Sequence, residues 1–236
     1  MHSPAPPIIP PDLLLSAYRS GIFPMADSRD DHEVFWVEPK KRAIIPLDGF
    51  RCSASLARTL KRGRFAITCN KAFSQVISAC SAPREPQDGS WISHRIEASY
   101  VMLHALGHAH SIECWQDGAL VGGLYGVGFD GVFCGESMFR RVPDASKVAL
   151  ATLVAAMRHG GHRLLDCQFM TDHLASLGAA EIPQTEYVAR LTRTQQQCRG
   201  VPELPDAYSS LLSSLLSSAG ASSPGKLIAQ SLTQTS

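Results

Sequence analysis

Two short apolar segments carry acidic and amide side chains that a buried strand does not normally contain. Residues 133–139 (FCGESMF) include Glu136, and residues 164–169 (LLDCQF) include Asp166 and Gln168. Burying such groups costs free energy unless each is hydrogen-bonded or used in chemistry. A carboxylate beside an amide and a second acid can orient or deprotonate an amine and handle a reacting carbonyl. We therefore expect the chemistry on these two strands, with a satisfied polar pair at a sheet end as the alternative.

The cysteines of the same strands raise a second possibility. Cys134 and Cys167 have His173 nearby in the sequence, which suggests a Cys/His nucleophile. Strand alternation places Cys167 with the apolar residues, as is usual for buried free cysteines. Cys134 shares a face with Glu136 and stays an alternative nucleophile.

Two further patterns suggest a cofactor or a metal, but neither has the right context. Residues 126–131 (GVGFDG) match G-x-G-x-x-G, but they lead into another strand and not into the helix that a dinucleotide site needs. His104, His108 and His110 lie close together, but Gly107 is expected to end a helix between the first two, and no carboxylate-rich ligand set accompanies them. We expect no cofactor and no metal.

Composition sets the broad class. The chain has 236 residues and is 44% hydrophobic, enough to bury a large core, and its 22 Lys and Arg nearly balance 21 Asp and Glu. The seven cysteines form no C-x-x-C pair, so neither a disulfide framework nor a thiolate zinc site is indicated. No secretory signal opens the chain, and no apolar run has the length of a membrane span. These features predict a soluble cytoplasmic protein.

The elements that must position the polar strands form an antiparallel meander followed by helix, strand, helix and strand. The Asp-Gly pairs at 117–118 and 130–131 predict hairpin turns within the meander. The expected strands are 110–116, 119–127, 132–138 and 163–169, and the expected helices around them are 91–106, 144–159, 171–177 and 185–191. This layout predicts the α+β class, with helices packed on one mixed sheet.

Three regions are expected along the chain. A soft boundary near residue 50 separates a small N-terminal domain, 1–50, from a catalytic domain, 51–200. The N-terminal part is expected to contain a helix at 11–19 and short strands at 34–37 and 43–47. Residues 201–236 are rich in Ser and Leu, and this composition predicts a largely disordered tail with at most one weak helix.

A helix expected at 53–62 carries only positive charges. Arg58, Lys61 and Arg62 are spaced i, i+3, i+4 and share one helix face, and Arg64 follows. The cations could simply complement the negative end of the helix dipole. They could equally form a face that binds nucleic-acid phosphates. Charge alone leaves both interpretations open.

The order of motifs from about residue 11 to 195 resembles the leucyl/phenylalanyl-tRNA–protein transferases of bacteria. The segments that carry the resemblance are 18–25 (YRSGIFPM), 91–92 (WI), 107–111 (GHAHS), 120–127 (LVGGLYGV), 135–139 (GESMF), 144–147 (DASK), 166–168 (DCQ) and 173–179 (HLASLGA). The resemblance implies a small N-terminal domain on a C-terminal domain with a GNAT-like (acetyltransferase-like) fold. It also implies transfer of Leu, Phe or Met from aminoacyl-tRNA to proteins that begin with Arg or Lys, which marks them for N-end rule degradation. A monomer is expected.

The same resemblance assigns roles to individual residues. Asp166 and Gln168 become the catalytic pair that positions or deprotonates the amine, and Glu136 supports them and attracts a basic N-terminal residue. Trp36 and Trp91 match aromatic residues that stack on the terminal adenosine of the tRNA. The implied pocket for the amino-acid side chain consists of Leu124, Phe133, Gly135, Leu150, Leu153 and Leu165. The implied contacts to the tRNA backbone are Arg58, Lys61, Arg62 and Arg64.

Two other functions fit the sequence less well than aminoacyl transfer. An acetyltransferase that uses acetyl-CoA should have a glycine-rich pyrophosphate loop before its main helix, and residues 140–146 (RRVPDAS) contain no glycine. A tRNA-binding protein without catalysis would leave the buried Glu136, Asp166 and Gln168 unexplained.

Overall fold

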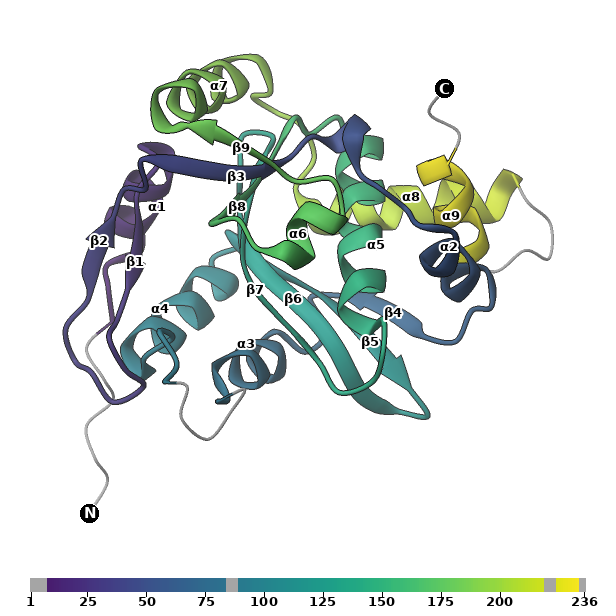
Figure 1. The fold of residues 1–236 in the computed structure, drawn as a ribbon, viewed down its shortest axis with the longest axis horizontal. Coiled ribbons are helices and arrows are strands. Elements are labelled where there is room, and N and C mark those ends of the chain that lie inside the picture. Colours follow the sequence, from purple (N-terminus) through teal and green to yellow (C-terminus); the bar gives the residue numbers. More distant parts are fainter. Residues whose placement is uncertain (1–7, 84–88, 219–223, 234–236) are drawn as a thin grey trace.

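The computed structural model describes residues 8–83, 89–218 and 224–233. Within these residues the centre of the fold is a seven-stranded sheet in the order β4-β5-β6-β7-β8-β3-β9 (Figure 1). The β7–β8 pair is parallel and the other pairs are antiparallel. The strands are β3 (Lys41–Ile45), β4 (Ala66–Cys69), β5 (Ala109–Gln116), β6 (Ala119–Phe129), β7 (Val132–Arg140), β8 (Leu164–Gln168) and β9 (Ala180–Pro183). The predicted α+β class with a mixed sheet is confirmed.

The strands β5, β6 and β7 form the predicted meander. Asp117 and Gly118 turn the first hairpin with φ of 51° and 77°, and Asp130 and Gly131 turn the second with φ of 43° and 75°. Two successive positive φ values define a type I′ turn, which Asp-Gly adopts at low cost. The G-x-G-x-x-G segment therefore belongs to a hairpin, as expected.

The parallel pair brings the two polar strands side by side. After β7 the chain crosses over through α5 (Ala145–His159) and returns as β8, the usual connection between parallel neighbours. Phe133 lies opposite Leu165, and Cys134 lies opposite Asp166. The paired register ends there, and Glu136 and Gln168 lie on the continuations of the two strands.

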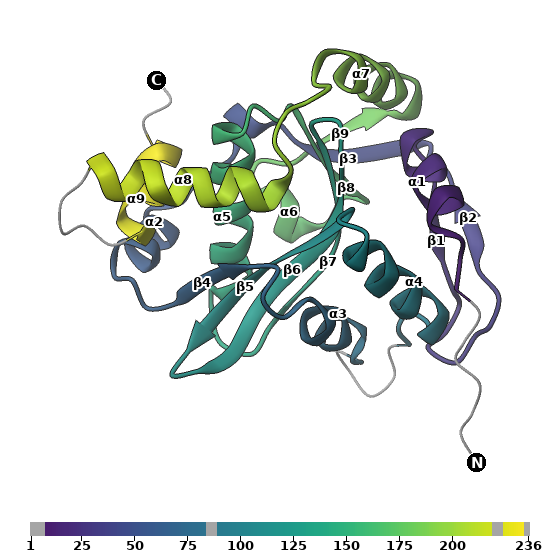
Figure 2. The ribbon, with the colours of Figure 1, turned by 180° about the vertical axis from the view of Figure 1, so that it is seen from behind.

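Helices cover the sheet through two apolar clusters (Figures 1 and 2). The first cluster contains buried residues of α5 and of α2 (Ala54–Lys61), α8 (Leu204–Ser218) and α9 (Pro224–Thr233). The second contains residues of α1 (Pro11–Arg19), α3 (Phe73–Ser81), α4 (His94–Ala105) and α7 (Gln184–Gln197). The remaining elements are β1 (Phe23–Met25), β2 (Phe35–Val37), a 3₁₀ turn at Leu47–Gly49, and α6 (Asp172–Ser176). Among the described residues, no helix is long and apolar enough to cross a membrane.

Serine caps start two of these helices. The Ser53 hydroxyl accepts a hydrogen bond from the Leu56 amide at the start of α2, and the Ser93 hydroxyl accepts one from the Ile96 amide at the start of α4. Each cap satisfies one of the amides that the first helical turn leaves without a partner.

The prediction of a disordered tail at 201–236 is wrong for the residues that the structure describes. The tail forms α8 and α9, with residues 219–223 and 234–236 outside the described ranges. Leu211 is buried in the first apolar cluster, and the Tyr208 hydroxyl donates to the Ile67 carbonyl of β4 at 2.9 Å. Serine is a mediocre helix former, but burial of an apolar face supplies most helical stability in proteins. Tertiary packing therefore outweighs a composition typical of disorder.

The predicted domain boundary near residue 50 is too late. The N-terminal region does contain α1 and a two-stranded sheet of β1 and β2. However, β3 (Lys41–Ile45) belongs to the main sheet, where it lies between β8 and β9. The partners of β3 are β8 and β9, which are more than 100 residues away in the sequence. The residues around position 50 therefore carry no signal that β3 belongs to the main sheet.

Candidate active site

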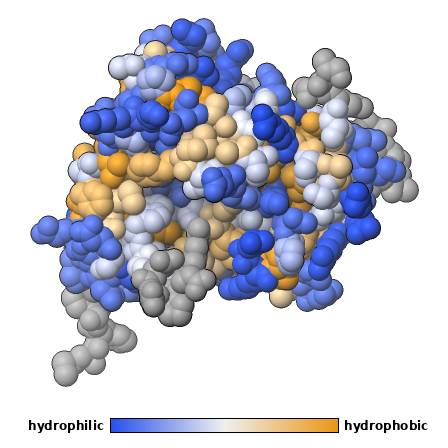
Figure 3. Space-filling view, viewed as in Figure 1, coloured by the Kyte–Doolittle hydropathy of each residue, from blue (hydrophilic) through white to orange (hydrophobic). Residues whose placement is uncertain are grey.

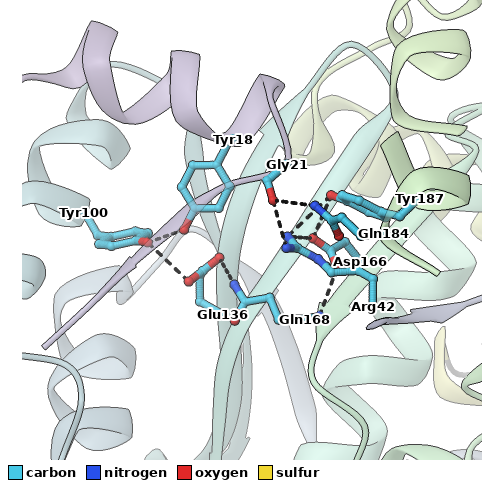
Figure 4. Close-up of polar contacts among 9 residues, drawn as sticks. All are labelled: Tyr18, Gly21, Arg42, Tyr100, Glu136, Asp166, Gln168, Gln184 and Tyr187. Atoms are coloured by element: carbon cyan, nitrogen blue, oxygen red, sulfur yellow. Dashed lines mark hydrogen bonds and ion pairs between the residues drawn. The ribbon is translucent and has the colours of Figure 1, made fainter. Parts of the chain in front are cut away.

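Asp166 is completely buried on β8 and is held by a fork of charged hydrogen bonds (Figure 4). Its Oδ1 accepts from Arg42 Nε at 2.9 Å, and its Oδ2 accepts from Arg42 Nη2 at 2.6 Å. The Tyr187 hydroxyl donates to Oδ2, and the Gln168 amide donates to Oδ1, each at 2.9 Å. Such bidentate pairs are among the strongest hydrogen-bonded contacts in proteins. Each oxygen of Asp166 thus already accepts two hydrogen bonds. Asp166 is therefore poorly placed to remove a proton from a substrate amine directly.

Arg42 is a residue of this site that the sequence did not single out, and the same is true of the tyrosines that bind the two carboxylates. Arg42 is also completely buried, and its Nη1 donates to the Gly21 carbonyl at 3.0 Å. Its guanidinium lies 4.7 Å from the ring centre of Phe23 and 4.4 Å from that of Tyr187, within cation–π range. Burial by itself lowers the pKa of Arg42, but the hydrogen bonds and charge of Asp166 outweigh burial and raise it. Arg42 therefore keeps its positive charge although it is buried.

A sequence signal for Arg42 existed but was weak. Arg42 ends a run of three basic residues, which is typical of an exposed segment, whereas the strand that begins at Lys41 is otherwise apolar. A cation within a buried strand needs a carboxylate partner. Its partner, Asp166, is 124 residues away in the sequence.

Glu136 lies in a different environment, built from a carboxamide and hydroxyl groups. Its Oε1 accepts from Gln168 Nε2 at 2.7 Å, and its Oε2 accepts from the Tyr100 hydroxyl at 3.2 Å. The Tyr18 hydroxyl is hydrogen-bonded to that of Tyr100 and adds to the network (Figure 4). Burial raises the pKa of Glu136 to about 7, although the hydrogen bonds from Tyr18 and Gln168 act in the opposite direction. Its charge therefore changes near neutral pH.

Gln168 connects the two carboxylates. Its backbone has φ of 63°, a left-handed conformation that is uncommon for a residue other than glycine. Its amide binds Asp166, and its side-chain Nε2 binds Glu136. Since Nε2 is committed in this way, Oε1 is left as an acceptor, with no hydrogen bond from any described residue. The site thus presents a carboxamide oxygen held in a fixed orientation, as expected for a group that receives an N–H.

The six residues of the implied amino-acid pocket lie on β6, β7, β8 and α5. The five apolar side chains belong to the first apolar cluster, and Gly135 lies on β7 between Phe133 and Glu136. The Phe133 ring packs so closely on Gly126 that a Cβ there would lie 2.5 Å from it. The five clustered side chains are those of Leu124, Phe133, Leu150, Leu153 and Leu165. The structure therefore brings the predicted set together; its role as a substrate pocket stays a prediction.

The two tryptophans lie on either side of β1. Trp36 on β2 pairs with Pro24 and is 40% exposed. The backbone carbonyl of Trp91 accepts from the amide of Ala26, directly after β1, at 3.2 Å. Both therefore contact the segment that follows Gly21, whose carbonyl accepts a hydrogen bond from Arg42. Figure 3 shows apolar residues on the surface over this β2 side.

The predicted basic residues are all at the surface and face away from the core. Arg58, Lys61, Arg62 and Arg64 are exposed, whereas Leu60 of the same helix is buried. Within the described part of the chain, none of the four forms an ion pair. They form a free cationic face, which we call the α2 face.

The alternative nucleophiles and the histidine group do not fit a reactive site. Burial raises the pKa of both Cys134 and Cys167, which opposes the thiolate form. The His104 ring stacks on Phe73 at 4.2 Å, and His110 is hydrogen-bonded to Asn70 at 3.0 Å. Both histidines are therefore engaged in packing or hydrogen bonds within the protein.

Comparison with known proteins gives consistent results. The family model described as leucyl/phenylalanyl-tRNA protein transferase matches residues 44–192, and that of the N-terminal domain of the same proteins matches residues 9–40. The first residues of β3, which belongs to the main sheet, lie between the end of one match and the start of the other.

Individual relatives are similar over most of the chain. The leucyl/phenylalanyl-tRNA–protein transferase of Novosphingobium aromaticivorans is 58% identical, with 98% of each chain covered. That of Rhizorhabdus wittichii is 61% identical over 78% of this chain and 74% of its own. A solved structure of a functionally unknown conserved protein from Staphylococcus epidermidis has a TM-score of 0.42 at 12% identity, covering 77% of this chain and 67% of its own. The chain belongs to the leucyl/phenylalanyl-tRNA protein transferase family and is an enzyme of that family.

Proposed function

We propose that this enzyme transfers Leu, Phe or Met from aminoacyl-tRNA to the N-terminal amine of proteins that begin with Arg or Lys. The product would then be recognised for N-end rule degradation. The observation that carries this proposal is the carboxamide of Gln168, which is held between Glu136 and Asp166 and whose oxygen accepts no hydrogen bond from any described residue. Family membership and the resemblance of the motifs support the choice of substrates.

In the proposed reaction, the neutral amine of the acceptor attacks the carbonyl carbon of the aminoacyl ester. Gln168 Oε1 accepts an N–H of the amine and directs its lone pair at the carbon. The new C–N bond forms, the C–O bond to the terminal ribose breaks, and the amine proton passes to the departing ribose oxygen. The products are an extended protein and a tRNA with a free terminal hydroxyl, so atoms and charges balance.

The two carboxylates have separate proposed roles. Asp166 holds the Gln168 backbone, and Arg42 holds Asp166, so both act by positioning. Glu136 orients the carboxamide and, when ionised, provides a negative charge for an incoming Arg or Lys side chain. An opposite charge at such a partly desolvated site favours basic acceptors over neutral ones.

The donor would occupy surfaces on both sides of this network. The five clustered apolar side chains and Gly135 would accept Leu, Phe or Met, because an apolar pocket separates such side chains by only about 1–3 kcal/mol. Trp36 and Trp91 would stack on the terminal adenosine, and the α2 face would bind the tRNA backbone. The proposal includes a GNAT-like catalytic domain, a monomer and a cytoplasmic location.

A transfer assay tests this function directly. The enzyme is given radiolabelled leucyl-tRNA with matched peptides that begin with Arg or with Ala. Label should appear on the Arg peptide and largely fail to appear on the Ala peptide. Absence of label on the Arg peptide would overturn the proposal.

The role of Gln168 is tested by a conservative substitution in the same assay. Gln168→Glu keeps the shape but removes the amide donor to Glu136 and adds a charge. We expect a fall in kcat of about 100-fold, the lower end of the effect of a positioned acid–base group. An unchanged kcat would show that the carboxamide does not position the amine.

A further inference from the structure

A cleft with a volume of about 750 Å³ lies beside the polar strands, and its charged lining is mostly basic. The end of α3, the last residues of β7, the connection to α5 and His173 of α6 form its walls. Arg140, Arg141 and Lys147 contribute three cations, against one carboxylate from Asp144. A concave surface with an excess of one charge concentrates ligands of opposite charge.

The cationic side chains of this cleft have N–H groups that are available to bind a ligand. Arg140 is exposed, and its side chain has no hydrogen bond or ion pair with any described residue. Lys147 Nζ lies 3.8 Å from Asp144 Oδ1, which leaves most of its hydrogen-bonding capacity unused. Arg141 is anchored by Nη1, which donates to the Leu120 carbonyl at 2.7 Å. Its guanidinium lies 5.5 Å from the ring centre of Phe139, which also lines the cleft.

The cleft and the active site share the strand β7. Arg140 is four residues beyond Glu136 on the same strand, a distance of about 13 Å at 3.3 Å per residue. Met138 and Phe139 lie between them and line the cleft. A ligand that reaches from the reacting ester along this strand therefore meets Arg140.

The other end of the cleft connects with the α2 face. Asp144 of the cleft accepts a hydrogen bond from the Thr59 hydroxyl of α2 at 3.3 Å. Thr59 lies between Arg58 and Arg62 on the sequence of that helix. The α2 face and the cleft are therefore in contact with each other.

We propose that this cleft binds the phosphates of the unpaired 3′ end of the donor RNA, with Arg140 and Lys147 as the main contacts. The proposal rests on the function proposed above, since it places the nucleotides next to the aminoacylated adenosine. The α2 face then contacts the more distant, base-paired part of the RNA. Single-stranded nucleic acid binds in this way, in basic grooves with aromatic side chains nearby.

Charge also excludes the second substrate from this cleft. An acceptor protein that begins with Arg or Lys carries positive charge at the end that must enter the site. Arg140, Arg141 and Lys147 repel such an end, whereas Glu136 attracts it when ionised. The two substrates therefore approach the Gln168 carboxamide from different sides.

Three donors of increasing length separate the contributions of the cleft and the α2 face. They are the leucyl ester of adenosine, which has no phosphate, the leucyl ester of the trinucleotide CCA, and complete leucyl-tRNA. Each is assayed with an Arg-initiated peptide and the wild-type enzyme, the double variant Arg140→Ala/Lys147→Ala, or the double variant Arg58→Ala/Arg62→Ala. Arg193→Ala removes an exposed cation from a different cleft and serves as the control.

The cleft variant, Arg140→Ala/Lys147→Ala, should raise KM at least about tenfold for the trinucleotide ester and for leucyl-tRNA. Its rate of transfer from the adenosine ester should stay within about twofold of the wild-type rate. The α2 variant should raise KM for tRNA alone, and Arg193→Ala should change none of the three. Unfolding curves in urea confirm that each variant is folded.

Two results would overturn the proposal for the cleft. One is a wild-type KM for the trinucleotide in the cleft variant, and the other is an equal loss with the adenosine ester, which would indicate damage to the catalytic strands. Failure of the wild-type enzyme with every donor would instead overturn the proposed function, and the cleft proposal with it.

Discussion

Asp166 and Glu136 are both buried carboxylates, but their neighbours give them different properties. Asp166 faces the guanidinium of Arg42, whereas Glu136 faces hydroxyl groups and the Gln168 carboxamide. Burial without a neighbouring cation disfavours the ionised form of a carboxylate. The pKa of Glu136 is therefore raised and its charge changes near neutral pH, whereas Asp166 is held in place by Arg42.

Replacing Arg42 should destabilise the protein strongly. Arg42→Met leaves the Asp166 charge buried without its partner, and the expected loss in the free energy of unfolding is about 3–5 kcal/mol. Urea unfolding measures it. Lys41→Met, at the neighbouring exposed residue that pairs with Glu181, should cost less than about 1 kcal/mol. Equal effects of the two substitutions would contradict the importance of the buried pair.

Replacing Glu136 should change the pH dependence of acceptor selection. In the wild type, the preference of kcat/KM for an Arg peptide over an Ala peptide should rise as Glu136 ionises around pH 7. The preference is expected to become independent of pH in Glu136→Gln, because that side chain stays neutral. Comparing the two peptides cancels the titration of the amine, which both share. A preference that still rises around pH 7 in the variant would assign the titration to another group.

Stability provides an independent check on the same group. The pKa of Glu136 is higher in the folded protein than the ordinary value of 4.5, so the folded state binds the proton more tightly. Its contribution is therefore fully present below pH 4.5 and is lost as pH rises through about 7. Relative to Glu136→Gln, the wild type should lose free energy of unfolding between pH 5 and pH 8. A constant difference between the two proteins would contradict the raised pKa.

At the scale of elements, α8 and α9 form a cover over α5 and α2. Their buried residues extend the first apolar cluster, which also contains the proposed substrate pocket. Gly225 of α9 approaches the Leu60 carbonyl of α2 so closely that a Cβ would lie 2.4 Å away. The Ser213 and Ser217 hydroxyls donate to carbonyls one turn earlier, which satisfies the polar face within the helix. The C-terminal helices are thus part of the core.

Two leucines of α8 test this packing. Leu211 is 3% exposed and Leu216 is 55% exposed. Leu211→Ala should lower the free energy of unfolding by about 2–5 kcal/mol, as for other truncations of buried leucine. Leu216→Ala should change it by less than about 0.5 kcal/mol. If Leu211→Ala has no effect, α8 does not pack on the core in solution.

At the scale of the whole molecule, a net charge of only +1 conceals two local concentrations of cations, the exposed α2 face and the basic cleft. The α2 face and the basic cleft are joined through Thr59 and Asp144, and Glu136 lies beyond them. This arrangement suits one polyanionic and one cationic substrate.

The α2 face should determine how tRNA binding depends on salt. Neutralising Arg58, Lys61 and Arg62 should weaken binding and reduce the slope of log K against log salt concentration by up to about three, roughly one for each lost phosphate contact. Fluorescence anisotropy with uncharged tRNA measures this slope. The matched control replaces Arg163, Arg190 and Arg193, which are exposed around another cleft. Equal changes in slope would indicate attraction by net charge and not by this face.

Much of the local structure could be predicted because its signals are local. The Asp-Gly hairpins, the Ser93 cap and the two polar strands follow from turn chemistry and alternation. The short β1 was missed, since three residues with a central Pro24 carry no strand pattern. The helix at 185–191 continues to Gln197 as α7 because its buried residues, Leu191 and Thr194, face the core.

The sequence by itself determined the fold class, the family and the residues most suited to chemistry, since composition, periodicity and motif order are properties of the chain. Only the tertiary structure decided what those residues contact. Arg42 meets Asp166, and Tyr100 meets Glu136, through pairings that join distant segments. The packing of α8 was likewise decided by surfaces that no local pattern describes. Burial and the partners it imposes set the pKa of Glu136, and both are properties of the folded molecule.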